Sequence, residues 1–409
     1  MKQNLSVEAA LEIVLQEARP LQSIEQLPLM AAYGGILGAN LSSKVNHPSA
    51  DDTAVDGYAC LEADARSAAV GNPVKLRVIG QSPAGKPFTG KVGSGEAVQV
   101  FTGAPIPKGA NAVIRVEDTL REGEFVWLMK PATAADIRRK GDDLVLGRTY
   151  LHKGDLLTPG RVGLAAAMGY ATLPVVRRPR VGILATGDEV VEPGEPLPFG
   201  GVYNSNSYSV AGLVLEAGGE PVILPKVSDS VEGVRTQLQR AGKLDLLLTT
   251  GGVSMGEYDI VRRMLELEGE IHFWKVRMQP GGPFLFARWN GLPLMGLPGN
   301  PVSAMVSFLL FGRAFLFKLL GRTDPPHQPI EAVADTPFEA NPTRRAYRRA
   351  VLRWTNDGYR VASTGNQSSA VLNSMAVGNA LVVLEAGHSV REGQRVEVIP
   401  FPGGLGTVL

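Results

Sequence analysis

The chain has 409 residues, which is too long for one ordinary hydrophobic core and predicts two to four domains. Hydrophobic residues make up 44% and charged residues 20%, a balance that excludes a disordered chain. The formal net charge of +1 argues against a protein that binds bulk nucleic acid, because that function needs a basic excess. The single cysteine, Cys60, excludes an intramolecular disulfide and points to a reducing compartment.

The N-terminal residues 1–26 predict a helix. Val7, Leu11 and Val14 recur at helical spacing among glutamates, which indicates an amphipathic helix and not a signal peptide. Since no sorting signal is recognisable, we expect the protein in the cytoplasm. Residues 27–45 then predict a connector.

From 46 to about 146 the pattern changes to a β-rich one. Short β-branched or alternating runs at 74–79, 97–101 and 112–116 are separated by glycine and proline clusters. A helix follows, with Thr158 as N-cap, Pro159 at the first helical position and Gly169 as its stop.

Residues 179–320 repeat a rhythm of strand, loop and helix. Strands are predicted at 181–185, 222–224, 244–249, 271–277 and 292–295, and helices at 206–217, 230–241, 258–267 and 302–320. This alternation predicts a mostly parallel sheet. The last helix approaches the length of a membrane span but contains Arg313 and Lys318, so we interpret it as a buried core helix.

Three loops follow strands of this sheet, at 185–189, 249–259 and 297–303. In a parallel sheet the ligand crevice lies beyond the carboxyl ends of the strands. Gly251 and Gly252 let backbone N–H groups approach an anion, and Ser254 adds a hydroxyl donor.

In the third loop, Pro298 precedes Asn300, which suits an N-cap, and Pro301, which suits the first helical position. Ser303 then lies in the positive first turn of the helix. Either glycine-rich loop alone is as consistent with a simple turn as with a site. Three such loops at one sheet edge favour a phosphate-binding site.

Acidic residues also fall at this edge, namely Asp188, Glu189, Asp229, Glu257 and Asp259. Carboxylates beside a phosphate repel it unless a cation intervenes, and Mg²⁺ held by one or two carboxylates resolves the conflict. Lys275 and Arg277 either balance this charge or are ordinary surface cations. The five histidines show no ligand spacing, and the P-loop pattern GxxxxGK[ST] is absent.

The C-terminal region, after a proline-rich boundary at 323–329, again predicts short strands, at 346–354, 380–384 and 395–399. Five arginines crowd the first of them, which indicates either a solvated face or an oxyanion site: Arg344, Arg345, Arg348, Arg349 and Arg353. Asp56-Gly57 is on pattern alone a turn.

Seven strings together resemble the MoeA family of molybdopterin molybdenumtransferases, to which the E domain of gephyrin belongs. They are VDGYA at 55–59, FTGAPIPKGANAVIRVED at 101–118, DIRRKGDDLVLG at 136–147, VGILATGDEV at 181–190, YNSNSY at 203–208, TTGGVSMGEYD at 249–259 and LPGNPVSAMVSF at 297–308. They occur in the order of the family and cover most of the chain.

The resemblance implies a multi-domain α/β plus β fold in four parts. Residues 1–26 and 179–322 would form the central molybdopterin-binding α/β domain, with a mostly parallel sheet. Residues 46–146 would form the β-rich second domain, and 323–409 a C-terminal β-barrel-like domain. Residues 27–45 with 147–178 would form an elongated linker and dimerisation domain.

The resemblance also implies the reaction. Such enzymes insert molybdate into adenylylated molybdopterin, with Mg²⁺-dependent release of AMP, to give the molybdenum cofactor. We therefore expect a homodimer with a composite active site, a molybdopterin adenylyltransferase as the handover partner, and neither nucleic acid nor a membrane as a partner.

Motif matching implies the site residues in two halves. Asp56, Thr102, Arg138 and Asp143 would come from the β-rich domain of one subunit. The α/β domain of the other would supply Glu189, Asp229, Asp259 and Lys275, with Pro298 and Pro301 shaping the helix-end loop. The residues with catalytic roles would be Asp259, Glu189, Asp56, Asp143 and Thr102. The residues that bind molybdate would be Lys275, Arg349 and Ser369. Those that bind Mg²⁺ would be Asp259, Asp229 and Glu189.

The chain departs from many relatives at 278–283, where Gln279 and Gly282 replace lysines, and at 367–369, where Gln-Ser-Ser replaces Gln-Gly-Ser. These changes affect the expected affinity for molybdate or the pterin phosphate. Two other functions stay open: a non-catalytic scaffold of the same fold, and a molybdopterin adenylyltransferase.

Overall fold

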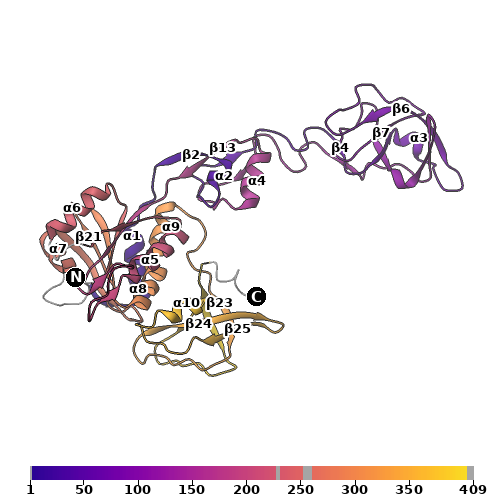
Figure 1. Ribbon diagram of the computed structural model, residues 1–409. Coiled ribbons are helices and arrows are strands. Elements are labelled where there is room, and N and C mark those ends of the chain that lie inside the picture. Colours follow the sequence, from indigo (N-terminus) through magenta and orange to yellow (C-terminus); the bar gives the residue numbers. More distant parts are fainter. Residues whose placement is uncertain (1, 227–230, 252–259, 403–409) are drawn as a thin grey trace.

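The computed structural model describes residues 2–226, 231–251 and 260–402. Figure 1 shows an elongated molecule, in which a β-rich domain lies far from an α/β body and a slender arm joins the two. The C-terminal domain packs beside the α/β body. The fold is thus the multi-domain α/β plus β architecture that the sequence predicts.

The body is built on a seven-stranded sheet. Its strands, in spatial order, are β1 (Lys2–Leu5), β19 (Gly269–Val276), β21 (Leu285–Trp289), β22 (Leu292–Leu297), β18 (Leu246–Thr250), β14 (Arg180–Ala185) and β17 (Glu220–Leu224). Only β21 runs antiparallel to its neighbours, and the other pairings are parallel. The carboxyl ends of the other six strands therefore meet at one edge.

Helices cover both faces of this sheet. One apolar layer contains α1 (Val7–Glu17), α5 (Ser205–Glu216) and the continuous helix Pro301–Leu320, and the other contains α6 (Val231–Ala241) and α7 (Ile260–Glu268). The long helix consists of α8 (Pro301–Ser307), a π-helical turn η2 (Phe308–Gly312) and α9 (Arg313–Leu320). By length and composition it is the one described helix that could span a membrane, but 83% of its most apolar window is buried, as in a core helix.

Two strands of the seven-stranded sheet, β1 and β21, were not predicted. The N-terminal helix is shorter than residues 1–26, because Lys2–Leu5 pairs with β19 as an edge strand and Ile24–Pro28 forms β2. Strand β21 was not predicted at all. Asn290 and Gly291 connect it to β22 with φ values of 47° and 78°, and this Asn-Gly pair is a hairpin signal that was overlooked.

The arm contains a ladder of β2 with β13 (Thr172–Val176), a second of β3 (Leu41–Ser42) with β12 (Thr149–Leu151), and the helices α2 (Leu29–Ala32) and α4 (Pro159–Ala167). Helix α4 begins as predicted, because the Thr158 hydroxyl accepts a hydrogen bond from the Arg161 N–H and Pro159 occupies the first turn.

The β-rich domain at the far end, domain II hereafter, holds a curled six-stranded sheet. Its order is β8 (Ala112–Arg115), β5 (Gly57–Cys60), β7 (Glu96–Val100), β6 (Val74–Ser82), β10 (Phe125–Leu128) and β9 (Thr119–Glu122). A small ladder of β4 (Asp52–Thr53) with β11 (Ile137–Arg138) and the short elements α3 (Glu62–Ala65) and η1 (Val116–Asp118) complete it. The strands predicted near 74–79, 97–101 and 112–116 are confirmed.

The C-terminal domain is a closed barrel of five strands, β23 (Ile330–Ala334), β24 (Arg345–Thr355), β25 (Gly358–Ser363), β26 (Ala380–Leu384) and β27 (Arg395–Pro400). Pairing of β24 with both β25 and β26 closes it. Strand β20 (Met278–Gln279) of the body adds to β24, and helix α10 (Asn373–Val377) lies against β24. The barrel is thereby attached beside the carboxyl end of β19.

Candidate active site

A cavity of about 600 Å³ opens at the carboxyl ends of β14, β18 and β22. The short parallel ladder of β15 (Val190–Val191) with β16 (Val202–Tyr203) forms one wall. The lining residues that matter here are Glu189, Tyr203, Asn206, Gly251, Asn300 and Pro301. The cavity therefore lies where the sequence places the ligand crevice.

Glu189 reaches this cavity from the loop after β14. Gly187 in the same loop has a φ of 115°, and a Cβ there would lie 2.7 Å from both carboxylate oxygens of Glu189. Only glycine therefore allows the carboxylate to fold against its own loop. Asp188 and Val190 are held nearby, since the Lys226 ammonium donates to both backbone carbonyls at 2.9 Å.

The loop after β18 contributes Gly251. Its φ is 91°, and an added Cβ would lie 3.1 Å from the Thr186 carbonyl oxygen, so glycine is required here as well. The Gly251 N–H donates to the Leu297 carbonyl at 3.0 Å, so this particular N–H serves the fold. Four other predicted site residues, Gly252, Ser254, Asp229 and Asp259, lie outside the described residues.

The loop after β22 ends in Asn300 at the N-cap of α8, with Pro301 in the first turn, as predicted. The Asn300 side chain makes no capping hydrogen bond. Instead its Nδ2 donates to the Ser369 hydroxyl at 3.0 Å, and the Val302 N–H donates to the Ser369 carbonyl at 3.2 Å. The helix N-terminus is therefore joined to a loop of the C-terminal domain.

A second cavity, of about 390 Å³, lies on the other side of Asn300. Its lining combines the turn at 278–283 with Pro298, Ser303, Arg344, Gln367, Ser368 and Ser369. Arg344 is exposed, and no ion pair of its guanidinium occurs among the described residues. This small polar space is suited to an inorganic oxyanion, because an arginine and hydroxyls converge on it.

Gln279 and Gly282, two of the departures from the family pattern, both line the smaller cavity. The side-chain Oε1 of Gln279 accepts a hydrogen bond from the Asn341 Nδ2 at 2.9 Å. A Cβ at Gly282 would lie 3.7 Å from the Arg344 Nη1, so the guanidinium lies near the space that a longer side chain would enter.

Arg349 lies beneath this cavity and not in its lining. Its side chain is fully buried, and it donates to the Ser374 hydroxyl at 3.1 Å and to the Ser368 carbonyl at 3.0 Å. Burial, and after it the charge of Arg348, lowers the Arg349 pKa to about 10. Arg349 thus supports the 366–369 loop from below. Arg344, by contrast, lies just before β24 and lines the cavity, a distinction that counting arginines did not make.

Lys275 ends β19 at the same edge of the sheet, with a φ of 68°. Its Nζ lies 4.0 Å from the centroid of the Trp274 ring, and it lines neither cavity. Arg344 nevertheless lies near this strand end, because the N–H of the next residue, Arg345, donates to the Arg277 carbonyl.

Domain II carries the other predicted residues. The Asp56 carboxylate accepts the Thr102 N–H at 2.7 Å and the Thr102 hydroxyl at 2.9 Å. These two donors, the backbone one first, hold the pKa of Asp56 below its ordinary value, so the group stays ionised. Gly57 makes this turn possible, because a Cβ there would lie 1.9 Å from the Ile114 carbonyl oxygen.

Arg138 and Asp143 are arranged differently. Arg138 binds Asp52 through two hydrogen bonds of 2.8 and 3.0 Å, and this pair raises the Arg138 pKa. Asp143 is exposed where the chain leaves domain II, with its N–H donating to the His47 carbonyl. No described cavity is lined by Asp56, Thr102, Arg138 or Asp143.

Within one chain the structure therefore brings together residues of the body and of the C-terminal domain, but not those of domain II. Glu189, Asn300, Ser303 and Ser369 lie around the two adjoining cavities. Domain II lies at the far end of the arm (Figure 1). Sequence reasoning grouped Arg344 with four other arginines but did not single it out. It missed Asn206, whose Nδ2 donates to the Gly299 carbonyl at 2.8 Å and for which the YNSNSY string was the available signal.

Three family models match consecutive parts of the chain. The MoeA N-terminal region (domain I and II) matches residues 5–169, a probable molybdopterin binding domain matches 182–318, and the MoeA C-terminal region (domain IV) matches 331–401. The breaks between them fall near the two chain segments that join the body to the arm and to the barrel.

Individual relatives match along nearly the whole length. The chain is 38% identical to molybdopterin molybdenumtransferase 2 of Mycobacterium tuberculosis over 385 residues, covering 92% of this chain and 94% of that protein. It is 35% identical to molybdopterin molybdenumtransferase of Haemophilus influenzae over 411 residues, covering 96% and 100%. A crystal structure of the molybdopterin biosynthesis MoeA protein from Pyrococcus horikoshii superimposes with a TM-score of 0.84 at 29% identity, covering 97% and 100%. The chain belongs to the molybdopterin molybdenumtransferase (MoeA) family.

Proposed function

We propose that this protein is a molybdopterin molybdenumtransferase that inserts molybdate into adenylylated molybdopterin and releases AMP. One observation carries the proposal: a larger cavity and a smaller one, lined by Arg344 and serine hydroxyls, adjoin at Asn300. The reaction needs such a pair, because an extended substrate with a phosphoanhydride must lie beside a tetrahedral metal oxyanion. The larger cavity, at about 600 Å³, is in the range of small-molecule sites.

The smaller cavity is the proposed molybdate site. Arg344 supplies charge, and the hydroxyls of Ser303 and Ser369 are suitable donors to molybdate oxygens. Arg349 acts through the loop that it holds at Ser368. Lys275 stays a candidate ligand at the same sheet edge, because its long side chain rests on Trp274 and is not held in an ion pair among the described residues.

The oxygen ligands available in the larger cavity are of the kind that Mg²⁺ prefers. Glu189 places a carboxylate in the larger cavity, and Mg²⁺ commonly takes one or two carboxylates together with substrate phosphates. Glu189 would hold the ion with Asp229 and Asp259, which lie outside the described residues. When bound, the ion neutralises phosphate charge in the bond that is cleaved.

The chain's own residues would then bind and orient the reactants. Gly251, Asn300 and Pro301 shape the wall against which the phosphates lie, and Asn206 fixes that wall through Gly299. We further propose a homodimer in which domain II of the second copy supplies Asp56, Thr102, Arg138 and Asp143. The ionised, doubly hydrogen-bonded Asp56 is suited to orient a proton or a cation in this site.

Incubation of the purified protein with adenylylated molybdopterin, molybdate and Mg²⁺ tests the function. We expect AMP release that depends on molybdate, with a molybdopterin adenylyltransferase as the natural source of the substrate. A scaffold protein releases no AMP. An adenylyltransferase instead consumes ATP in the presence of molybdopterin, and either result would contradict the proposal.

A further inference from the structure

The arm joins the body through two chain segments. The first runs from Ala18 to Ser23, between α1 and β2, and the second comprises Arg177 to Pro179, between β13 and β14. The Arg177 N–H donates to the Ser23 carbonyl at 3.1 Å, which ties the two segments together. Everything beyond this junction, including domain II, is carried by the arm (Figure 1).

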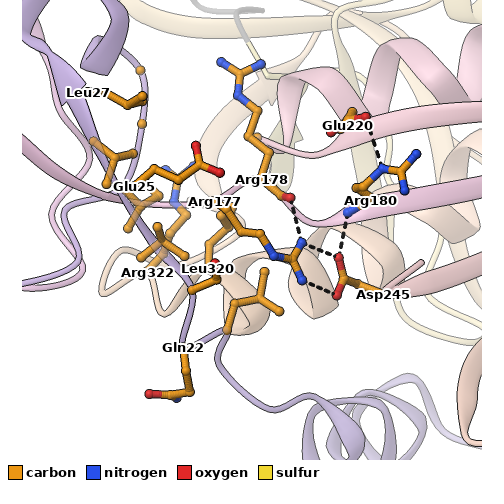
Figure 2. A pocket seen from close by; sticks show the side chains of 18 of the residues that line it. Gln22, Glu25, Leu27, Arg177, Arg178, Arg180, Glu220, Asp245, Leu320 and Arg322 are labelled. Atoms are coloured by element: carbon orange, nitrogen blue, oxygen red, sulfur yellow. Dashed lines mark hydrogen bonds and ion pairs between the residues drawn. The ribbon is translucent and has the colours of Figure 1, made fainter. Parts of the chain in front are cut away.

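An ion pair fastens the second segment to the body. The Arg177 guanidinium donates to the two carboxylate oxygens of Asp245 at 2.7 and 2.8 Å, and the same carboxylate accepts the Arg180 N–H at 2.8 Å. Asp245 immediately precedes the central strand β18, and its N–H donates to the Arg180 carbonyl at 2.8 Å. Figure 2 shows this fork of hydrogen bonds from Arg177 to Asp245.

Other contacts also hold the junction. A small apolar cluster of Ile36, Val176 and Leu320 lies there, and the Leu21 N–H donates to the Leu319 carbonyl. Gly154 of the arm lies so close to the body that a Cβ there would come within 2.6 Å of the Gly321 carbonyl oxygen. Beside these contacts is a cavity of about 680 Å³, remote from the strand-end cavities. Because this cavity leaves the junction incompletely filled by side chains, the angle of the arm depends on directional polar contacts as well as on packing.

The Arg177–Asp245 ion pair is suited to fix the orientation of the two segments it joins. The side chains of Arg177 and Asp245 are only 22% and 8% exposed, so solvent screens their attraction weakly. The two parallel hydrogen bonds fix the orientation of the guanidinium as well as its distance. Arg178 and Arg180 flank the junction, but in the described part of the chain neither forms an ion pair across it. Arg180 instead pairs with Glu220 within the body.

We propose that Arg177 and Asp245 are positioning residues that hold the arm at the angle at which domain II reaches the site of a second copy. This inference rests on the composite site proposed above. Neither residue lines a strand-end cavity, so neither touches the substrate. A small rotation at the junction moves Asp56 by a distance that grows with the length of the arm, and misplacement by about 1 Å can cost about 100-fold in rate.

The test measures the arm angle and turnover separately. Single cysteines replace Glu122 in β9 and Gln239 in α6, both exposed, and carry spin labels; the native Cys60 is fully buried. Doubly labelled chains diluted in unlabelled protein report distances within one subunit. We compare wild type with Arg177→Gln and Asp245→Asn. The matched control is Arg360→Gln, which breaks an arginine–aspartate pair with Asp335 inside the C-terminal barrel.

We expect the distance distribution to broaden in Arg177→Gln and Asp245→Asn and to stay narrow in Arg360→Gln. We also expect kcat to fall by about tenfold or more in both junction variants, with molybdate affinity unchanged. A narrow distribution in both variants would overturn the inference, as would a broad one with wild-type kcat. Failure of the proposed function is distinguishable, because wild type would then release no AMP while the distances still report the junction.

Discussion

Domain II and the α/β body differ in what each contributes to the proposed site. Domain II presents Asp56 as an exposed carboxylate, fixed by Thr102 and kept ionised, but no described cavity surrounds it. The body, together with the C-terminal domain, encloses two adjoining cavities; the larger contains the Glu189 carboxylate, and the smaller is lined by Arg344 and serine hydroxyls. Positioned side chains and enclosed space are thus separated along the chain, and the proposed homodimer would bring them together.

The largest expected effect comes from removing the charge of domain II at the site. Asp56→Asn keeps the shape of the turn but loses the ionised group, so we expect kcat to fall by about 10²- to 10⁴-fold. The melting temperature should fall only slightly, because the weakened hydrogen bonds from Thr102 are made at an exposed side chain. Steady-state AMP release measures the effect, and Asp118→Asn, in a surface pair with Lys130, is the control. Wild-type turnover in Asp56→Asn would remove domain II from the site.

The next effect belongs to the smaller cavity, which the body shares with the C-terminal domain. Arg344→Ala removes the charged donor from this cavity, which we expect to weaken molybdate binding by about 10- to 100-fold, the equivalent of a lost charge-assisted hydrogen bond. Arg353→Ala, in the same domain but paired with Asp335, is the control. Calorimetric titration with molybdate distinguishes the two. Equal affinity in wild type and Arg344→Ala would assign the oxyanion to another place.

The third prediction concerns how the free energy of unfolding depends on pH. Burial, and after it the charge of Arg313, lowers the His327 pKa from its ordinary value of 6.5 to about 4. Between these values the unfolded chain binds a proton that the folded chain does not, so the free energy of unfolding falls as pH falls from 6.5 to 4. Between pH 7 and pH 5 we expect a loss of about 2 kcal/mol from this group, and a smaller loss in His327→Gln.

Chemical denaturation at pH 7 and pH 5 measures this dependence. The exposed His388 provides the control variant His388→Gln, for which the pH dependence should equal that of wild type. Identical pH dependence in His327→Gln and wild type would show that another group is responsible.

The smallest effect lies in the arm. Thr158→Ala removes the N-cap of α4 and should cost about 1 kcal/mol of stability. Because α4 lies away from both halves of the site, kcat should stay at the wild-type value. Thr172→Ala, at the exposed start of β13, is the control. A large loss of kcat in Thr158→Ala alone would mean that the arm participates beyond its role as a spacer.

The sequence predicted the elements whose signals are local. Buried runs such as that of β18, and caps such as Thr158, depend on neighbouring residues and were found. Strand β1 was missed because its pairing with β19 is a contact across more than 260 residues of chain, and residues 2–5 carry no strand pattern of their own. Strand β21 did carry a signal, the Asn290-Gly291 turn, which the proline- and glycine-rich stretch before it obscured.

The site was predictable in position but not in side-chain direction. Strand ends identified Glu189, Gly251 and Asn300, because parallel strands bring their loops to one edge. Which arginine lines the smaller cavity depends on the folded chain around β24: Arg344, just before the strand, is in the lining, and Arg349, within the strand, is buried underneath. The separation of domain II from the body follows from the arm's geometry, which no local pattern contains.

Complementation between two inactive chains tests the composite site most directly. Chains carrying Asp56→Asn are co-expressed with chains carrying Glu189→Gln, each with its own affinity tag, and the mixed dimers are isolated. If each site joins domain II of one copy to the body of the other, every mixed dimer has one intact site of two and regains about half the wild-type turnover. If both residues act within one chain, every site stays defective, and mixed dimers without activity would contradict the account.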